Sequence, residues 1–254
     1  MFNEERYRYI IDLLEQNGKV LVKDLSQVFH MSESMVRKDL QTLEKMNLLK
    51  RTYGGAINVN HTITPCASLS TRTQQNIDIK ESVAKKVCEV IKEHETIFLD
   101  ASSISFMVAK QLIELNLTLT VITNMLAIAS LVPENSAIQF IFIGGDFNPF
   151  VGGSIGSYAN AQIQHYRCTK AFLGCCGLDL RDGSISTGFS EDASTKKTIL
   201  NVSRENYLLL LNEKFEQRSS FIFSHLTDYS GLITDSLPDA MIQNQLKEAG
   251  VPLL

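Results

Sequence analysis

Apolar side chains in the first 46 residues recur three and four positions apart, the spacing that lines one face of an α-helix. The pattern predicts helices over residues 4–17 and 22–29, and a third helix that begins after Ser32 and ends near Met46. Gly18 is typical of the residue that follows a helix, and Ser32 of the residue that caps one. Three short amphipathic helices are therefore expected at the start of the chain.

Two short strands are expected directly after the third helix. Residues 48–53 and 56–59 each form a short strand-like run, and the pair Gly54-Gly55 between them is typical of a tight turn. Three helices followed by a β-hairpin predict a winged helix-turn-helix, which we place in residues 1–59.

The rest of the chain alternates apolar runs with helical patterns. Residues 60–75 are polar, contain Pro65 and lack periodicity, which indicates a linker, and a helix is expected over 77–93. The alternation that follows predicts a mostly parallel sheet covered on both faces, in one α/β domain over residues 76–254. We expect strands at 96–100, 118–123, 138–143, 171–174, 207–211 and 231–234, and helices near 104–114, 125–131, 156–166, 192–203 and 238–248.

Composition narrows the class of protein. Hydrophobic residues make up 44% and charged residues 20% of the 254 residues, as in ordinary globular proteins. The N-terminus lacks the apolar segment of a signal peptide, and no apolar run reaches the roughly 18 residues of a membrane span. We therefore expect a cytoplasmic protein that does not bind a membrane.

The cysteines suggest neither a metal site nor a disulfide framework. They are odd in number and have no zinc-like spacing. The adjacent Cys175 and Cys176 follow an apolar strand, which favours buried thiols over a redox pair. We expect reduced cysteines, no metal and no cofactor. The cysteines are Cys66, Cys88, Cys168, Cys175 and Cys176.

The net charge of −4 is unevenly distributed. Residues 1–60 hold nine Lys or Arg and eight Asp or Glu, a balance of +1, whereas the other 194 residues hold 15 and 20, a balance of −5. This asymmetry is compatible with a DNA-binding head on an acidic body but does not require one.

The outward face of the third helix has the chemistry of a DNA-reading surface. Arginine reads guanine and glutamine reads adenine in the major groove, whereas serine and lysine bind phosphates. An ordinary solvated helix face is the alternative. The short helix and tight turn before it, its hydroxyl-rich first turn and the basic hairpin after it favour DNA. The side chains expected at DNA are Ser32, Ser34, Met35, Arg37, Lys38, Gln41, Lys45, Arg51 and Tyr53.

Small and polar residues gather where the predicted parallel strands end. After Asp100 closes a strand, three serines open a helix, and the free N–H groups of a helix N-terminus favour phosphate. A serine-capped turn without a ligand is the alternative for this segment alone. Because ligands bind beyond the carboxyl ends of parallel strands, residues at the later strand ends are expected to join the same rim. These residues include Asn124, Gly144, Gly145 and Lys214.

The head resembles that of the DeoR family of repressors. The family shows Val-Ser-x-x-Thr-Ile-Arg-Arg-Asp-Leu, Leu-Glu and Arg-x-x-Gly-Gly-Ala, which match residues 31–40, 43–44 and 51–56. Here Met35 replaces a threonine and Lys38 an arginine, so the preferred operator can differ from the family's usual one. Within the matched runs, Asp39 and Glu44 are expected to orient neighbours or form salt bridges rather than read bases.

The resemblance extends over the body, which by it looks like ribose-5-phosphate isomerase. The family runs Asp-x-Gly-Thr-Thr, Thr-Asn, Gly-Gly, Asp-x-x-Lys-Phe and Thr-Asp fall on residues 100–104, 123–124, 144–145, 212–215 and 234–235. Ser102 replaces a glycine, Ile104 a hydroxyl and Asn212 a carboxylate. The resemblance implies a phosphorylated sugar effector. The candidate effector-binding residues are Asp100, Ser102, Ser103, Ile104, Ser105, Asn124, Gly144, Gly145, Glu191 and Lys214.

Three functions remain open at this point. The leading one is a repressor of sugar transport or catabolism genes, a homodimer or homotetramer on double-stranded DNA, gated by the effector. The second is a sugar-phosphate isomerase, for which Asp100 and Glu191 are the plausible bases. The third is a regulator whose body has lost its ligand and only oligomerises. Because no compact acid/base constellation is visible and an isomerase needs no winged helix, we expect no enzymatic activity.

Overall fold

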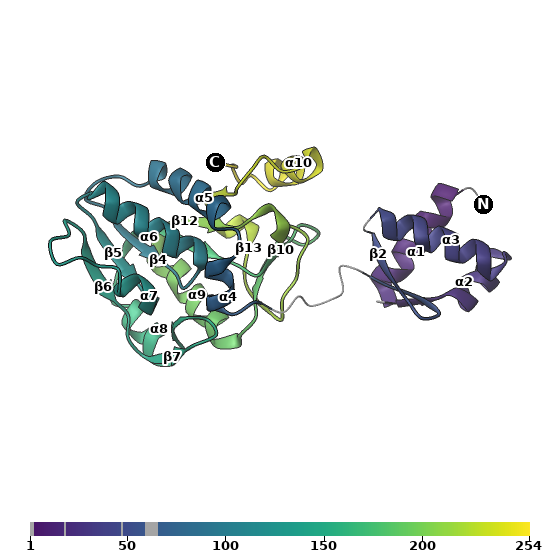
Figure 1. Cartoon of the computed structure of the whole chain (residues 1–254), viewed down its shortest axis with the longest axis horizontal. Helices are drawn as coiled ribbons and strands as arrows, with labels where there is room; N and C mark the ends of the chain where they lie inside the picture. The colour runs from purple at the N-terminus through teal and green to yellow at the C-terminus, as the bar shows by residue number, and fades with distance from the viewer. Residues whose placement is uncertain (1–2, 18, 47, 59–65) are drawn as a thin grey trace. The chain divides into compact units, whose positions relative to one another are not determined.

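The computed structural model describes residues 3–17, 19–46, 48–58 and 66–254. The chain divides into two compact units, Met1–Ile63, here called the head, and Thr64–Leu254, here called the body (Figure 1). Residues 60–65 of the predicted linker lie outside the described residues. The rest of that segment is not linker, because helix α4 (Leu69–Gln74) forms there and belongs to the body. The polar segment lacks a helical apolar stripe, so its helix left no pattern to detect.

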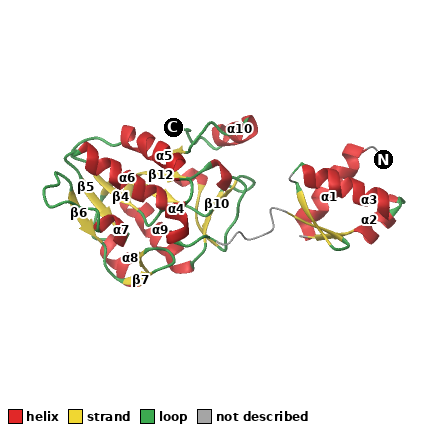
Figure 2. Ribbon diagram, in the orientation of Figure 1, coloured by secondary structure: helices red, strands yellow, loops and turns green. Residues whose placement is uncertain are grey.

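Three helices form the head around one small core (Figure 2). They are α1 (Asn3–Asn17), α2 (Val22–Phe29) and α3 (Glu33–Lys45), as the apolar spacing predicted. His30 adopts the left-handed conformation with φ 52°, which ends α2 and turns the chain into α3. The buried core residues are Ile10, Leu14, Val20, Val22, Leu25, Val36, Leu40, Leu43, Leu49 and Ala56.

A small antiparallel sheet completes the head and confirms the winged helix-turn-helix. The predicted hairpin is β2 (Leu49–Thr52) and β3 (Gly55–Asn58), and the sheet order is β1-β3-β2. Strand β1 (Lys19–Leu21) was not predicted, because three residues are too few to show a period. A Cβ at Gly55 would lie 2.0 Å from the Val20 carbonyl oxygen, so glycine at this position permits the β1–β3 pairing.

The body is built on a six-stranded sheet with the order β14-β12-β9-β4-β5-β6. Every neighbouring pair is parallel, which confirms the predicted α/β class. The strands correspond to the six predicted runs. Their bounds are β4 (Thr96–Leu99), β5 (Thr120–Thr123), β6 (Gln139–Phe142), β9 (Cys168–Gly174), β12 (Ser203–Leu209) and β14 (Gly231–Ile233).

Helices cover both faces of this sheet and create two cores. Along β4, Ile97 and Leu99 belong to one core and Phe98 to the other, because successive strand side chains point to opposite faces. The first core is covered by α5 (Ile77–Val90), α6 (Ser103–Leu115) and α7 (Leu126–Ala129). The second is covered by α8 (Ser157–Ile163), α9 (Ser190–Val202) and α10 (Ala240–Glu248).

Short antiparallel strands were not predicted. One group is β10 (Gly177–Asp179), β11 (Ser184–Thr187) and β13 (Phe221–His225), and a second is the hairpin of β7 (Asp146–Asn148) and β8 (Gly153–Ile155). They are three to five residues long and rich in serine and glycine, so neither length nor periodicity marks them.

The short strand β10 carries a buried carboxylate. Asp179 in β10 is 1% exposed, and its carboxylate binds the guanidinium groups of Arg181 and Arg218. Asp182 lies in the turn that follows, where its carboxylate accepts a hydrogen bond from the Ser184 N–H at 2.8 Å.

The strand order reverses between β4 and β9. From β4 the chain proceeds outward to β5 and β6, and it then returns to the other side of β4 to form β9, β12 and β14. In open parallel sheets, a crevice forms beyond the carboxyl ends of the strands at such a reversal. The body therefore has a natural ligand position between the loops that follow β4 and β9.

Candidate functional site

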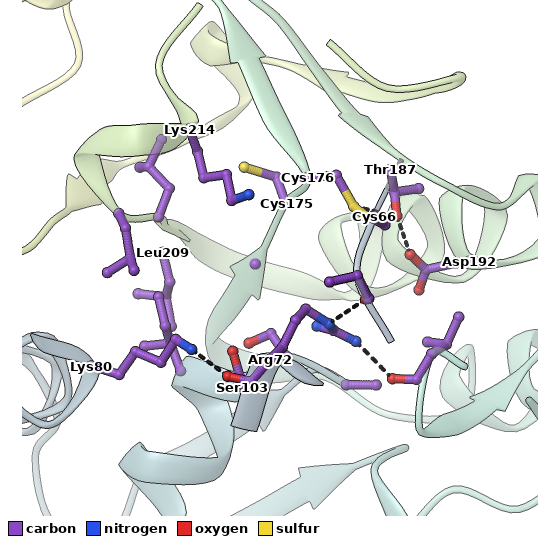
Figure 3. Close-up of a pocket in the computed structure, with 18 of the residues that line it drawn as sticks. Cys66, Arg72, Lys80, Ser103, Cys175, Cys176, Thr187, Asp192, Leu209 and Lys214 are labelled. Atoms are coloured by element: carbon purple, nitrogen blue, oxygen red, sulfur yellow. Dashed lines mark hydrogen bonds between the residues drawn. A yellow bond between two sulfur atoms is a disulfide. The ribbon is translucent and has the colours of Figure 1, made fainter. Parts of the chain in front are cut away.

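A pocket of about 120 Å³ lies at this reversal (Figure 3). Its floor comes from the residues that follow β4, β9 and β12, and the segment around α4 forms another wall. Ser103 and Ile104, in the first turn of α6, line it beside the N-cap residue Ser102. The N-terminus of a 13-residue helix thus faces the pocket, which is favourable for an anion.

Ser102 departs from the family glycine, and the structure shows how it fits. Its hydroxyl oxygen accepts a hydrogen bond from the Ser105 N–H at 3.1 Å, so Ser102 caps α6. Gly174, at the end of β9, lies against it, and a Cβ there would be 2.6 Å from the Ser102 Cβ. The serine side chain therefore occupies space that a residue larger than glycine at position 174 would need.

Cationic side chains outnumber acidic ones around the pocket. Among the described residues that line it, Arg72, Lys80, Lys196 and Lys214 are cationic, and Asp192 and Glu213 are acidic. This excess of positive charge in a confined space favours an anionic ligand.

Three of these cations differ in the net shift of their pKa. It lowers the pKa of Arg72 and the pKa of Lys80 from their ordinary values, which marks both as desolvated cations. Burial also lowers the pKa of Lys196, but the carboxylates of Asp100 and Asp192 raise it by more, so the net shift is upward. The Lys196 ammonium therefore stays charged inside the protein.

Asp100 and Ser105 support the pocket from behind rather than lining it. The Asp100 carboxylate, 1% exposed, accepts hydrogen bonds from the Ser105 hydroxyl and the Gly174 N–H, both at 2.8 Å, and binds the Lys196 ammonium. These bonds join the loop after β4, the end of β9 and helix α9. The direct effector contact expected of Asp100 and Ser105 is therefore replaced by a positioning role.

Four other predicted residues lie away from the pocket. Asn124 is buried and donates to the Ser154 carbonyl at 2.9 Å, and the Gly144 N–H donates to the Gln162 side chain at 3.2 Å. Gly145 follows directly, and Glu191 is exposed on α9. For Asn124, Gly144 and Gly145 the reason is topological: β5 and β6 extend from β4 away from β9, so their ends do not reach the pocket. Of the predicted set, Ser102, Ser103, Ile104 and Lys214 line it.

Sequence reasoning missed Arg72, Asp192 and the position of Lys196. Arg72 projects from α4, where its guanidinium donates to the carbonyls of Ala67 at 3.1 Å and Val151 at 3.0 Å. It lies in the aperiodic segment, so no pattern identified it. Asp192 and Lys196 are four residues apart on α9 and share one face, and this spacing is the sequence signal that was available.

The cysteine prediction was wrong for one pair. A disulfide joins Cys66, just before α4, to Cys176, just after β9. Cys88, Cys168 and Cys175 carry free thiols, as expected. The two partners are 110 residues apart in sequence, a distance over which cysteine spacing carries no information on pairing. Within the described ranges, no three His, Cys, Asp or Glu side chains gather closely enough to hold a metal ion.

The predicted DNA-reading side chains lie on one exposed region of the head. Val36, Leu40 and Leu43 bury the inner face of α3, which leaves the outer face open. All nine predicted contacts are exposed, including Met35 at 50% and Tyr53, which projects fully from the hairpin turn. Arg37 forms an exposed ion pair with Glu33 at 2.7 Å, which can exchange for a contact to DNA.

Two acidic residues position this surface, as predicted. Asp39, on the buried side of α3, accepts two hydrogen bonds from the Arg6 guanidinium of α1, at 2.9 and 3.1 Å. Glu44 holds Arg51 of β2 at 2.6 Å, and this hydrogen bond lowers the pKa of Glu44. Arg51 is therefore exposed and oriented by Glu44 through its Nε–H, while the terminal nitrogens of the guanidinium are further donors that suit a phosphate.

No helix among the described residues combines the length and the apolar character needed to cross a membrane.

Comparison with known proteins assigns both units. Residues 6–62 match a DeoR-like helix-turn-helix domain, and residues 75–236 match the DeoR C-terminal sensor domain. The HTH-type transcriptional regulator YulB of Bacillus subtilis (strain 168) is 30% identical over 258 residues, which cover 100% of this chain and 98% of that protein. The glycerol-3-phosphate regulon repressor of Escherichia coli (strain K12) is 28% identical over 257 residues, which cover 100% of this chain and 99% of the repressor.

Among solved structures, ribose 5-phosphate isomerase A from Methanocaldococcus jannaschii matches 56% of this chain and 55% of its own, with 17% identity and a TM-score of 0.41. The family assignment rests on the two domain matches, which together span both units. The chain belongs to the DeoR family of helix-turn-helix transcriptional regulators.

Proposed function

We propose that the protein is a repressor whose operator binding is gated by a phosphorylated sugar or a related metabolite. The observation that carries this proposal is the cationic pocket at the N-terminus of α6, in a chain that also presents an exposed recognition helix. A phosphate at the α6 N-terminus would meet free N–H groups, the Ser103 hydroxyl and the nearby cations Arg72 and Lys196.

The remaining polar groups suit the sugar part of such a ligand. The carboxylates of Asp192 and Glu213 line the same pocket and are acceptors for hydroxyl groups. Relatives of this chain include a glycerol-3-phosphate regulon repressor and a lactose phosphotransferase system repressor. Both relatives support a role in controlling genes of sugar transport or catabolism.

The head supports DNA binding as an oligomer. A single helix-turn-helix reads a short half-site, so we infer that the protein binds double-stranded DNA as a homodimer or homotetramer. Because a regulator of this kind works beside the genome, we infer that the protein acts in the cytoplasm. A non-enzymatic role is supported by the position of Asp100 and Glu191, because neither of these candidate bases lines the pocket as far as the chain is described.

The proposal is tested by fluorescence anisotropy of the purified protein on labelled DNA from its own upstream region. We expect binding that exceeds binding to random DNA by at least ~10³ and weakens with salt. We expect one member of a sugar-phosphate panel to change this affinity. Specific binding that no sugar phosphate alters would support the ligand-free regulator instead, and turnover of a sugar phosphate would support the isomerase.

Replacing Arg37 by methionine is expected to weaken operator binding by about 10- to 100-fold, because a bidentate arginine–guanine contact discriminates by about 1–3 kcal/mol. Binding to random DNA should fall much less. Arg167→Met is the matched control, because Arg167 is an exposed arginine of the body. Equal losses on operator and random DNA would show that Arg37 contacts phosphate rather than a base.

Replacing Ser103 by aspartate is expected to abolish the response to the effector while leaving operator binding intact. The carboxylate would occupy the first turn of α6 and repel a phosphate there, yet it suits the helix N-terminus, so the fold should tolerate it. Calorimetric titration with the active sugar phosphate measures the loss. Ser157→Asp, at the exposed first position of α8, is the control. Undiminished binding to Ser103→Asp would place the phosphate elsewhere.

A further inference from the structure

The Cys66–Cys176 disulfide lies in the wall of the pocket, beside both the cationic side chains and the apolar side chains that line it. Both cysteines line the pocket, and their Cα atoms are 5.7 Å apart, within the range that a disulfide spans without moving the backbone (Figure 3). Cys66 precedes α4, and Cys176 follows the end of β9. The bond therefore fixes the segment before α4 to the sheet edge at which the ligand is expected.

The segment that this bond holds is the strap, residues 66–76, which contains α4 and forms one wall of the pocket. Its middle is held by the Leu69 N–H, which donates to the Phe150 carbonyl at 2.9 Å, and by the Arg72 contact to Val151. Its C-terminal end is held by the Lys80 ammonium, which donates to the carbonyls of Arg72 and Gln75.

The N-terminal end of the strap has a different kind of anchor. Besides the disulfide, Cys66 packs against Gly188, where an added Cβ would lie 3.1 Å from the Cys66 Cβ. Glycine at position 188 thus gives Cys66 room to reach Cys176. The covalent bond and the close fit act at the same point, so the first residues of the strap depend on this anchor.

We propose that Cys66 and Cys176 are a reversible redox latch that holds the N-terminal end of the strap on the effector pocket. In the disulfide state the strap is fixed at both ends. In the dithiol state its N-terminal end is released, and the rest of the strap is held by the hydrogen bonds of Leu69, Arg72 and Lys80 without a covalent anchor. The regulatory role of the latch rests on the proposed function of the pocket as an effector site. The formation and reduction of the disulfide do not depend on that function.

The chemistry uses glutathione disulfide as the oxidant. One cysteine thiolate attacks a sulfur of glutathione disulfide, which forms a mixed disulfide and releases one glutathione thiolate. The second cysteine thiolate then displaces the other glutathione and closes the Cys66–Cys176 bond. The two protein sulfurs lose two electrons, glutathione disulfide gains them, and the two thiol protons pass to solvent. Excess glutathione reverses both steps.

Reversibility follows from exposure and compartment. Cys66 and Cys176 are both half-buried, so a small thiol can reach them. A transcriptional regulator shares its compartment with reducing thiols, where disulfides that form are usually transient or sensing. Burial raises the pKa of Cys88 and Cys168 to about 11 and that of Cys175 to about 12, so these thiols are poor competitors for exchange.

The latch also contacts the groups that would bind the ligand. The Cys176 sulfur lies 3.7 Å from the Thr187 hydroxyl, and that hydroxyl donates to the Asp192 carboxylate in the pocket. A change in the redox state of Cys176 therefore acts on Thr187, whose hydroxyl binds the Asp192 carboxylate that lines the pocket. Arg72, in the strap that the disulfide holds, and Asp192, which binds the Thr187 hydroxyl, both line the pocket beside this bond.

The test uses the full chain equilibrated in buffers of increasing glutathione disulfide content. Free thiols are alkylated, and peptides are mapped without reduction. We expect a cross-linked Cys66–Cys176 peptide whose abundance rises with the oxidant. Amide hydrogen exchange in α4 should be about tenfold slower in the oxidised protein, because local opening of the strap is suppressed. Cys66→Ser should lose both effects, and the control Cys88→Ser should keep both.

Two results would overturn the latch. One is a Cys176 that is alkylated at every ratio of glutathione to its disulfide. The other is α4 exchange that is the same in both redox states. Titration with ribose 5-phosphate and the rest of the sugar-phosphate panel separates this proposal from the proposed function. Redox-dependent α4 exchange without any ligand binding would leave the latch standing and remove the effector.

Discussion

Replacing Asp100 by asparagine should cost the body about 3–5 kcal/mol of stability, the loss expected when one partner of a buried ion pair is removed. The Lys196 ammonium is 6% exposed at its side chain, and in the variant it would face an amide in place of a carboxylate. Its charge would then lose the carboxylate that it binds directly and keep only the longer-range attraction of Asp192. Urea denaturation followed by circular dichroism, together with amide exchange in β4 and β9, measures the effect.

Two further variants make this prediction specific. The double variant Asp100→Asn with Lys196→Met removes the charge that has lost its partner and should recover much of the lost stability. Lys197→Met changes the neighbouring, exposed lysine of α9 and should alter stability by less than about 0.5 kcal/mol. A single variant as stable as the wild type would mean that Lys196 does not depend on Asp100.

Replacing Arg6 by methionine should destabilise the head by about 2–4 kcal/mol, because it leaves the Asp39 carboxylate buried without its partner. The two side chains are 8% and 9% exposed. This loss is smaller than the loss of about 3–5 kcal/mol that is typical of a deeply buried pair, because both side chains keep some contact with solvent. Operator affinity should fall with the folded fraction of the head, while sugar-phosphate binding by the body is unchanged.

Amide exchange in the intact chain resolves the Arg6 effect by region. Amides of α1 and α3 should lose protection, and those of the β4–β9 region should keep it. Arg37→Met is the matched control, because it breaks the exposed pair with Glu33, which is worth at most about 1 kcal/mol. Equal exchange in Arg6→Met and Arg37→Met would contradict the prediction.

Most of the regular structure was predictable because long periodic segments carry their own signal. The helices of the head and the six parallel strands each show a clear apolar pattern, and residues such as Ile97, Phe98 and Leu99 are buried on both faces of the sheet. Strands such as β1 and β10 escaped prediction because three residues show no period. Their pairing is decided by neighbours distant in sequence.

The candidate pocket was predictable at its centre and not at its margins. The serines that begin α6 follow directly from a strand-to-helix turn. By contrast, Arg72 and Cys66 come from an aperiodic segment, and their positions depend on contacts with Val151 and Cys176. Asn124 was misplaced because the strand order, which decides which ends meet, is a property of the whole sheet.

The contact between Ser102 and Gly174 means that the residue at position 174 can become larger only when the residue at position 102 is smaller. A residue larger than glycine at 174 would meet the serine Cβ at about 2.6 Å, so Gly174→Ala alone should strain the end of β9. Paired with Ser102→Gly, the same alanine finds the vacated space. A side chain at position 174 can thus take the space that the Ser102 side chain now fills. This exchange needs two substitutions, of which Ser102→Gly must come first. An engineer who transplants ligand specificity between relatives would need to exchange both residues as a unit.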